Sequence, residues 1–445
     1  MEEKEEINKA KELLKAIKDG KIDETLANIN YSDIPILEKV GVLLNIYSDP
    51  NYAKKIFERI LDLDPENLSA KYSLGFAYFR LKDWEKALFY FQEVLKEDPT
   101  NSACWEEIGI IQINRGEYEK AIEAFEKAIK YSPTDVLPYF QLAQIYFQLQ
   151  DYGKALKYIN KALELRPRDT KILKEKANIL LALQKYEEAI EPLEEIIEEN
   201  PNDIETLLNL SFIFCQLKKY DLALKLINQA ITLAPNDSKI LVSKGYILGK
   251  LGRIKEELKY YERAIKLNPN DWQAYFNQGV VYYELQEKEK ALELFQKALS
   301  LNPAASEVHH NIGILYLEKK EGEKAYYHLL KAVQLNPKIG NYWYSLGLFY
   351  LETGDAKTAS QCFDEGLKYD INSYLLFSGK ALALKEMDRL EEALRFINEA
   401  ITINPYNSQL WYDKGEILEK MGKKEEAQEC FKKGKELEEI KNSCF

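Results

Sequence analysis

Prolines recur along most of this chain at intervals of 34 residues. Nine of them follow one another without a slip, Ile371 holds the next place in the series, and Pro405 the place after that. The nine are Pro65, Pro99, Pro133, Pro167, Pro201, Pro235, Pro269, Pro303 and Pro337. Inside a helix a proline removes a backbone hydrogen bond and clashes with the preceding turn, so each of these prolines marks a helix end. A fixed period of this length predicts an array of helical hairpins.

Other positions follow the same period. If the proline stands at position 32 of each repeat, twelve repeats fill residues 34–441 without an insertion. Position 8 is small in all twelve repeats, and position 20 is alanine in eleven, Glu257 being the exception. Positions 4 and 24 often carry bulky apolar residues such as Trp105 and Phe125. We expect two antiparallel helices to approach closely at the small positions, while the bulky side chains fill space against the neighbouring repeat.

Each repeat contains two blocks of apolar residues at helical spacing, separated by turn-prone residues such as Gly116 and Gly354. A single hairpin cannot bury its own apolar face, whereas stacked hairpins bury a continuous core. The sequence therefore predicts an all-α solenoid over residues 34–441. A helical N-terminal cap is expected in residues 1–33, and a C-terminal tail in residues 442–445.

These repeated residues resemble the tetratricopeptide repeat family, and the resemblance covers residues 34–441. It implies a right-handed superhelical solenoid of about twelve helix-turn-helix repeats. It also implies a concave face, built from the first helix of each repeat, that binds peptides or partner proteins. Enzymes that contain such arrays usually carry a separate catalytic domain. Because the array fills nearly all of this sequence, we expect no enzymatic activity and no cofactor.

Composition narrows the classes of partner. The formal net charge of −12 argues against a nucleic-acid surface, which needs clustered lysines and arginines. No apolar run approaches the ~18 residues of a membrane-spanning helix, so we expect no membrane insertion. The five cysteines are scattered, and the acidic N-terminus does not resemble a secretory signal. Both features favour a cytoplasmic protein with reduced thiols.

The histidines and glycines show no catalytic or metal-binding pattern. The three histidines are His309, His310 and His328, and they do not form a His-Glu-x-x-His motif. His309 occupies position 4, where we expect it to pack in the core. His310 follows it and is expected to face the groove and contact a peptide. Gly379 precedes a lysine but lacks the rest of a phosphate-binding loop.

Four polar residues resemble the carboxylate clamp of chaperone-binding members of the family. They are Lys174, Asn178, Asn209 and Lys239. In such a clamp, ammonium and amide groups grip the free C-terminus and an acidic side chain of a chaperone tail. A further basic residue of the clamp is replaced here by Ser243, so the resemblance implies a partial clamp. The alternative is that these are ordinary polar residues on exposed helix faces.

Positions 5 and 6 of the first helices supply the other candidate groove residues. The asparagines at position 6, Asn209, Asn277 and Asn311, resemble a ladder of amides that hydrogen-bonds the backbone of an extended peptide. Position 5 is aromatic in five repeats, at Tyr72, Phe140, Phe276, Tyr344 and Tyr412. These rings either line the groove and add apolar contact area, or pack between adjacent first helices.

The leading functional hypothesis is a non-catalytic scaffold or adaptor that holds other proteins or peptide segments on the concave face. The alternative is a co-chaperone that docks acidic C-terminal tails through the partial clamp. Self-association by stacking of terminal repeats is a third hypothesis. No metal site is expected.

Overall fold

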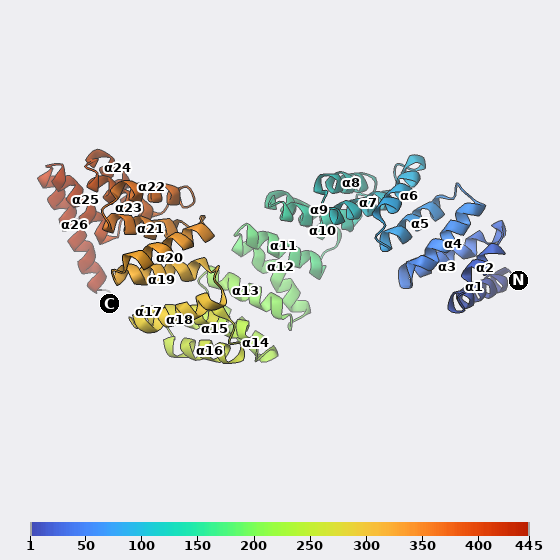
Figure 1. Ribbon diagram of the computed structural model, residues 1–445, viewed down its shortest axis with the longest axis horizontal. Helices are drawn as coiled ribbons and strands as arrows, with labels where there is room; N and C mark the ends of the chain where they lie inside the picture. Colours follow the sequence, from blue (N-terminus) through green and yellow to red (C-terminus); the bar gives the residue numbers. More distant parts are fainter. Residues whose placement is uncertain (1, 444–445) are drawn as a thin grey trace. The chain divides into compact units, whose positions relative to one another are not determined.

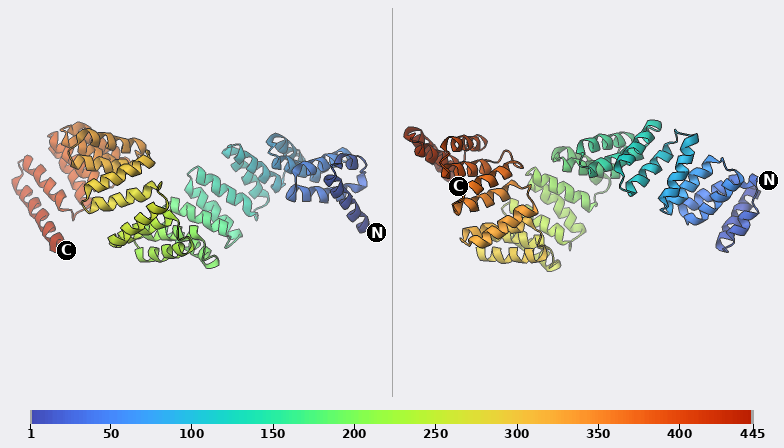
Figure 2. Two further views of the ribbon diagram at one scale, coloured as in Figure 1. Left: turned by 60° about the horizontal axis from the view of Figure 1, so that its bottom comes forward. Right: turned by 45° about the horizontal axis from the view of Figure 1, so that its top comes forward.

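The computed structural model describes residues 2–443, and within them it contains α-helices, one 3-10 turn and no strand (Figure 1). The chain divides into two compact units, of which unit 1 ends at Lys218 and unit 2 begins at Lys219. In the repeats, each odd-numbered helix is the first of its hairpin and each even-numbered helix the second. The two helices lie side by side in opposite directions (Figure 2). The prediction of an all-α array of helical hairpins is confirmed.

Unit 1 holds the N-terminal helices, five complete repeats and the first helix of the next. Its α-helices are α1 Glu2–Lys18, α2 Ile22–Ala27, α3 Ile34–Tyr47, α4 Pro50–Leu63, α5 Leu68–Arg80, α6 Trp84–Glu97, α7 Ser102–Asn114, α8 Tyr118–Tyr131, α9 Val136–Gln148, α10 Tyr152–Leu165, α11 Thr170–Ala182, α12 Tyr186–Glu199 and α13 Ile204–Gln216. A 3-10 turn, η1 Tyr31–Asp33, precedes α3.

Unit 2 begins with the second helix of that repeat and continues through six more repeats. Its α-helices are α14 Tyr220–Leu233, α15 Ser238–Lys250, α16 Ile254–Leu267, α17 Trp272–Glu284, α18 Lys288–Leu301, α19 Ser306–Glu318, α20 Gly322–Leu335, α21 Gly340–Glu352, α22 Ala356–Leu367, α23 Tyr374–Glu386, α24 Leu390–Ile403, α25 Ser408–Lys420 and α26 Lys424–Ser443.

The two helices of a hairpin meet where position 8 faces position 24. A Cβ atom added to Gly109 would lie 2.7 Å from Cζ of Phe125, and one added to Gly347 would lie 2.5 Å from Cε1 of Phe363. These distances are too short for a side chain, so glycine is needed for the close approach. The alanines at position 20 are buried in the same contact. The small-residue positions therefore act as predicted.

Most first helices begin with an Asn or Asp cap two residues after the periodic proline. The side chain of Asn67 accepts a hydrogen bond from the backbone N–H of Ala70, and that of Asp203 accepts one from Thr206. Such caps satisfy backbone groups that the helix leaves unpaired. The proline ends one helix and the cap begins the next, which keeps the repeats in register.

The ends of the array differ from its middle. In residues 1–33, Leu13, Ile22 and Leu26 join the core of the first repeat, and Lys9 forms an ion pair with Asp33. This segment therefore covers an apolar face of the first hairpin. At the other end, α26 continues through residues 442 and 443, so the helix extends into the segment predicted as a tail. Residues 444–445 of that tail lie outside the described part of the chain.

Candidate peptide-binding groove

The first helices of consecutive repeats lie next to one another within each unit. Direct contacts join α5 to α7 and α9 to α11 in unit 1, and α19 to α21 and α23 to α25 in unit 2. Side chains at positions 2, 5, 6, 9, 12 and 13 of these helices form what we call the first-helix face. All nine predicted site residues belong to this face.

Lys174 is held by two carboxylates. Its Nζ lies 2.8 Å from Oδ2 of Asp203 and 2.9 Å from Oε2 of Glu205, and these hydrogen bonds raise the pKa of Lys174. Because Asp203 caps α13, the lysine ties α11 to the start of the next first helix. A peptide carboxylate would have to share this ammonium with two carboxylates of the protein, which use two of its three N–H donors.

The other predicted clamp residues remain more open. Asn178 and Lys239 are exposed and Asn209 is half-buried, and none of these side chains forms a hydrogen bond or ion pair within residues 2–443. Ser243 is exposed, and its hydroxyl donates a hydrogen bond to the backbone oxygen of Lys239 over 3.0 Å. Lys239 and Ser243 belong to unit 2 and the others to unit 1. The convergence of Lys174, Asn178, Asn209 and Lys239 on one carboxylate stays a prediction.

The remaining two asparagines differ in how their amides are used. Asn311 donates from Nδ2 to the backbone oxygen of Glu307 in its own helix, over 2.8 Å. The half-buried amide of Asn277 forms no hydrogen bond to any residue that the structure describes. The amide of Asn277 is therefore available to a ligand, whereas one donor of Asn311 is already used within its own helix.

The aromatic residues at position 5 pack within their own hairpins. The ring centroid of Tyr344 lies 6.0 Å from that of Phe363, and the ring of Phe276 lies 5.7 Å from that of Phe295. In both cases the partner is the position-24 ring of the second helix. These half-buried rings thus rest on the hairpin core.

His310 links two neighbouring first helices. Its Nε2 atom lies 2.9 Å from the hydroxyl oxygen of Ser345, and its ring centroid lies 4.8 Å from that of Tyr342. Burial lowers the pKa of His310 to about 4, so the ring is neutral at neutral pH. Its contact with a peptide stays a prediction, and any such contact would compete with the bond to Ser345.

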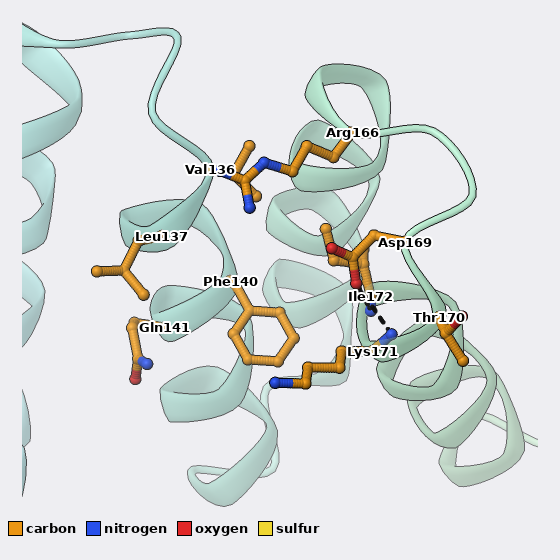
Figure 3. A pocket seen from close by; sticks show the side chains of 9 residues that line it. All are labelled: Val136, Leu137, Phe140, Gln141, Arg166, Asp169, Thr170, Lys171 and Ile172. Atoms are coloured by element: carbon orange, nitrogen blue, oxygen red, sulfur yellow. Dashed lines mark hydrogen bonds between the residues drawn. The ribbon is translucent and has the colours of Figure 1, made fainter.

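A pocket opens in unit 1 between α9 and α11, with a volume of about 560 Å³ (Figure 3). Its lining residues come from α9, from the end of α10 and from the start of α11. They are Val136, Leu137, Phe140, Gln141, Arg166, Asp169, Thr170, Lys171 and Ile172. Of these, sequence reasoning had singled out only Phe140. Arg166 is the one basic residue at position 31 of any repeat, and this feature of the sequence could have indicated the pocket.

Two half-buried carboxyl groups of α7 also lie on the first-helix face. Burial, with a smaller contribution from the charge of Asp135, raises the pKa of Glu106 to about 7. Burial raises the pKa of the adjacent Glu107 to about 7 as well. The sequence interpretation missed both, because their burial depends on how α7 packs against its neighbours.

No group of three or more His, Cys, Asp or Glu side chains is placed to hold a metal ion in residues 2–443. Over the same residues, no helix has the length and apolar character needed to cross a membrane.

Family models match three parts of the chain. One, described as the Cilia and flagella-associated protein 70 C-terminal domain, matches residues 237–444. A second, described as Anaphase-promoting complex, cyclosome, subunit 3, matches residues 51–128 and 114–196. A third, described as Tetratricopeptide repeat, matches residues 180–241.

Two curated proteins match short parts of the chain, and one solved structure shares its fold. "Protein STIP1 homolog" of Dictyostelium discoideum is 29% identical over 84 residues, which are 19% of this chain and 15% of that protein. An uncharacterized protein of Methanocaldococcus jannaschii is 41% identical over 49 residues, 11% of this chain and 57% of the relative. The chain thus covers less than two thirds of either relative's length. A chain in the crystal structure of the APC/C hetero-tetramer Cut9–Hcn1 superposes with a TM-score of 0.51 at 13% identity, covering 96% of this chain and 92% of that one.

Proposed function

Because the chain belongs to the tetratricopeptide-repeat proteins, we propose that it is a non-catalytic scaffold that binds peptide segments of partner proteins on its first-helix face. The observation that carries this proposal is the pocket between α9 and α11, where the face is hollowed and apolar. The amide of Asn277 and the ammonium of Lys239 support it, because both lack a side-chain partner in the described residues. Exposed aromatic edges and unpaired polar groups are the usual components of a peptide-binding surface.

The cysteines suit a reducing compartment, which supports a cytoplasmic location within this proposal. Cys104, Cys215, Cys362 and Cys430 are all free. Burial raises the pKa of Cys104 to about 12 and that of Cys362 to about 11, so neither thiol is activated for chemistry.

Partner capture tests the scaffold proposal. The full chain and the double variant Lys239→Glu/Asn277→Ala are used to retain proteins from native extract, which are identified by mass spectrometry. The matched control is Lys225→Glu/Asn228→Ala, which makes the same changes at exposed positions of the second helix α14. We expect the control to retain the partners of the wild-type chain and the first-helix variant to lose those that bind the first-helix face of unit 2. Equal retention by all three proteins would place binding elsewhere, and retention of nothing would argue against a scaffold.

A co-chaperone that docks acidic C-terminal tails is the second candidate. The exposed Lys239, whose ammonium has no partner among the described residues, favours it. The two carboxylates on Lys174 weigh against it, since they neutralise the charge that the clamp would offer to a ligand. A synthetic peptide with an acidic last residue and a free C-terminus tests this candidate by calorimetry. The clamp requires affinity to fall for Lys174→Ala and for Lys239→Ala, and to weaken with salt; unchanged affinity in both variants rules it out.

A further inference from the structure

We propose that the pocket between α9 and α11 selects its ligand: it accepts one apolar side chain of an extended peptide in which a neighbouring residue carries a carboxylate. This inference rests on the proposed function, because it specifies the kind of peptide that the first-helix face of unit 1 binds. It concerns a site separate from the predicted clamp, none of whose residues lines the pocket.

The base of the pocket is apolar. Val136 and Ile172 are buried beneath it, and the half-buried ring of Phe140 stands at its centre (Figure 3). Leu137 contributes a side chain that is 37% exposed. A volume of about 560 Å³ falls within the range of ~300–1,000 Å³ that is common for ligand pockets. The space and its lining therefore suit a branched aliphatic or aromatic side chain, which would pack against the Phe140 ring.

Two cations flank this apolar base. Figure 3 shows the side chains of Arg166, from the end of α10, and Lys171, from the first turn of α11, reaching toward α9 on either side of Phe140. Both residues are exposed. Neither side chain forms a hydrogen bond, an ion pair or a ring contact with any residue between 2 and 443. Their charges are thus available to a ligand.

The single carboxylate in the lining is already engaged. Oδ1 of Asp169 accepts hydrogen bonds from the backbone N–H groups of Lys171, over 2.9 Å, and Ile172, over 3.3 Å, and so caps α11. Counting Arg166, Lys171 and Asp169, the lining carries a net charge of +1, on a chain whose formal net charge is −12. Lys174 differs from these two cations, because two carboxylates of the protein neutralise its charge.

The arginine is specific to this repeat. Arg166 stands at position 31, and no other repeat has a basic residue there. In the others, position 31 holds Asp64, Asp98, Ser132, Asn200, Ala234, Asn268, Asn302, Asn336, Asp370, Asn404 and Glu438. The fold does not need a cation at this position, since the other hairpins form without one. A guanidinium beside an ammonium around an apolar pocket complements a carboxylate next to an apolar side chain.

Selection from a random-peptide phage library, with the full chain as bait, tests the proposal. We expect the enriched peptides to share an apolar residue with Asp or Glu beside it. A synthetic copy of an enriched peptide is then titrated by fluorescence anisotropy against the wild type and against Arg166→Glu/Lys171→Glu. Loss of one charge-assisted contact should weaken binding about tenfold or more, and replacing the acidic residue of the peptide by its amide should weaken binding to the wild type similarly.

The control variant is Lys157→Glu/Arg168→Glu. It makes the same change in net charge at exposed positions of α10 and of the same loop, but neither residue lines the pocket. We expect affinity within about threefold of the wild type at moderate salt, because screening weakens charges without direct contact. Circular dichroism checks that both variants fold. Peptides that bind all three proteins equally, or that share no acidic residue, overturn this inference and leave the scaffold intact. Enrichment of no peptide contradicts both.

Discussion

Glu257 shows how far a single residue can depart from the repeat pattern and still be accommodated. It replaces the alanine of position 20 and is 8% exposed. The Tyr261 hydroxyl donates a hydrogen bond to Oε1 of Glu257 over 3.2 Å, and a Cβ on Gly249 in the facing helix would lie 2.4 Å from the same oxygen. The carboxyl group is thus accommodated because Gly249 leaves space and Tyr261 supplies a hydrogen-bond donor at a position where the other repeats have phenylalanine, leucine or isoleucine.

This buried carboxyl group makes stability depend on pH. Burial raises the pKa of Glu257 from 4.5 to about 7 in the folded chain; the charge of Glu284 adds to the shift, while Tyr261 and Lys250 oppose it. Below pH 4.5 the group is neutral in both states and carries no penalty. As the pH rises through about 7, the folded chain must bury a charge, so the free energy of unfolding falls.

We therefore predict that Glu257→Gln flattens the pH dependence. Urea unfolding at about pH 5 and pH 8 should show a smaller loss of stability in the variant, with a difference on the order of 1–3 kcal/mol. Glutamine keeps an acceptor for the Tyr261 hydroxyl, so the packing is retained. Parallel curves for the two proteins would show that Glu257 is not the group responsible.

Position 8 gives a second test at the scale of one residue. A Cβ on Gly279 would lie 2.7 Å from two ring carbons of Phe295, so Gly279→Val should destabilise the chain by about 1–3 kcal/mol through overpacking. Gly322→Ala is the matched control in the same unit, because the nearest atom to its Cβ would be Cε2 of Phe349 at 3.8 Å. Thermal unfolding measures both. A harmless valine at Gly279 would contradict the close packing of α17 and α18.

At the scale of the element, bulky residues at position 4 do more than fill space. The indole N–H of Trp105 donates to the backbone oxygen of Pro99 over 3.0 Å, and the indole N–H of Trp343 donates to that of Pro337 over 2.8 Å. His309 makes the same kind of contact with Pro303, at 3.3 Å. The position-4 side chain thus pins the loop between repeats to the first turn of the next helix.

This contact predicts a cost for an otherwise conservative change. Trp343→Phe keeps most of the ring but removes the donor, so it should lower the free energy of unfolding by about 0.5–1.5 kcal/mol. The control is Trp272→Phe, since Trp272 lies at the first position of its repeat and its indole forms no hydrogen bond in the described chain. Calorimetric melting compares the two variants. Equal effects would mean that lost ring area, and not the bond to Pro337, sets the cost.

The helices were largely predictable and their contacts were not. The apolar blocks predict two helices in each repeat, as α7 and α8 show, because the period repeats the same signals twelve times. Lys82 and Gln150 follow first helices and have positive φ although neither is glycine, the residue that this conformation favours. Lys174 was expected to be open to ligands, but its two carboxylates come from the following repeat. A pattern within one repeat does not show such contacts between repeats.

At the scale of the whole molecule, each repeat contacts mainly its neighbours. A substitution in one repeat should therefore destabilise mainly that repeat and the repeats next to it. The closest test of the central claim is hydrogen–deuterium exchange of the full chain with and without a peptide enriched from the library, followed by mass spectrometry. We predict slower exchange in the odd-numbered first helices, with the largest effect in α9 and α11. Protection confined to the even-numbered second helices would contradict the claim that peptides bind the first-helix face.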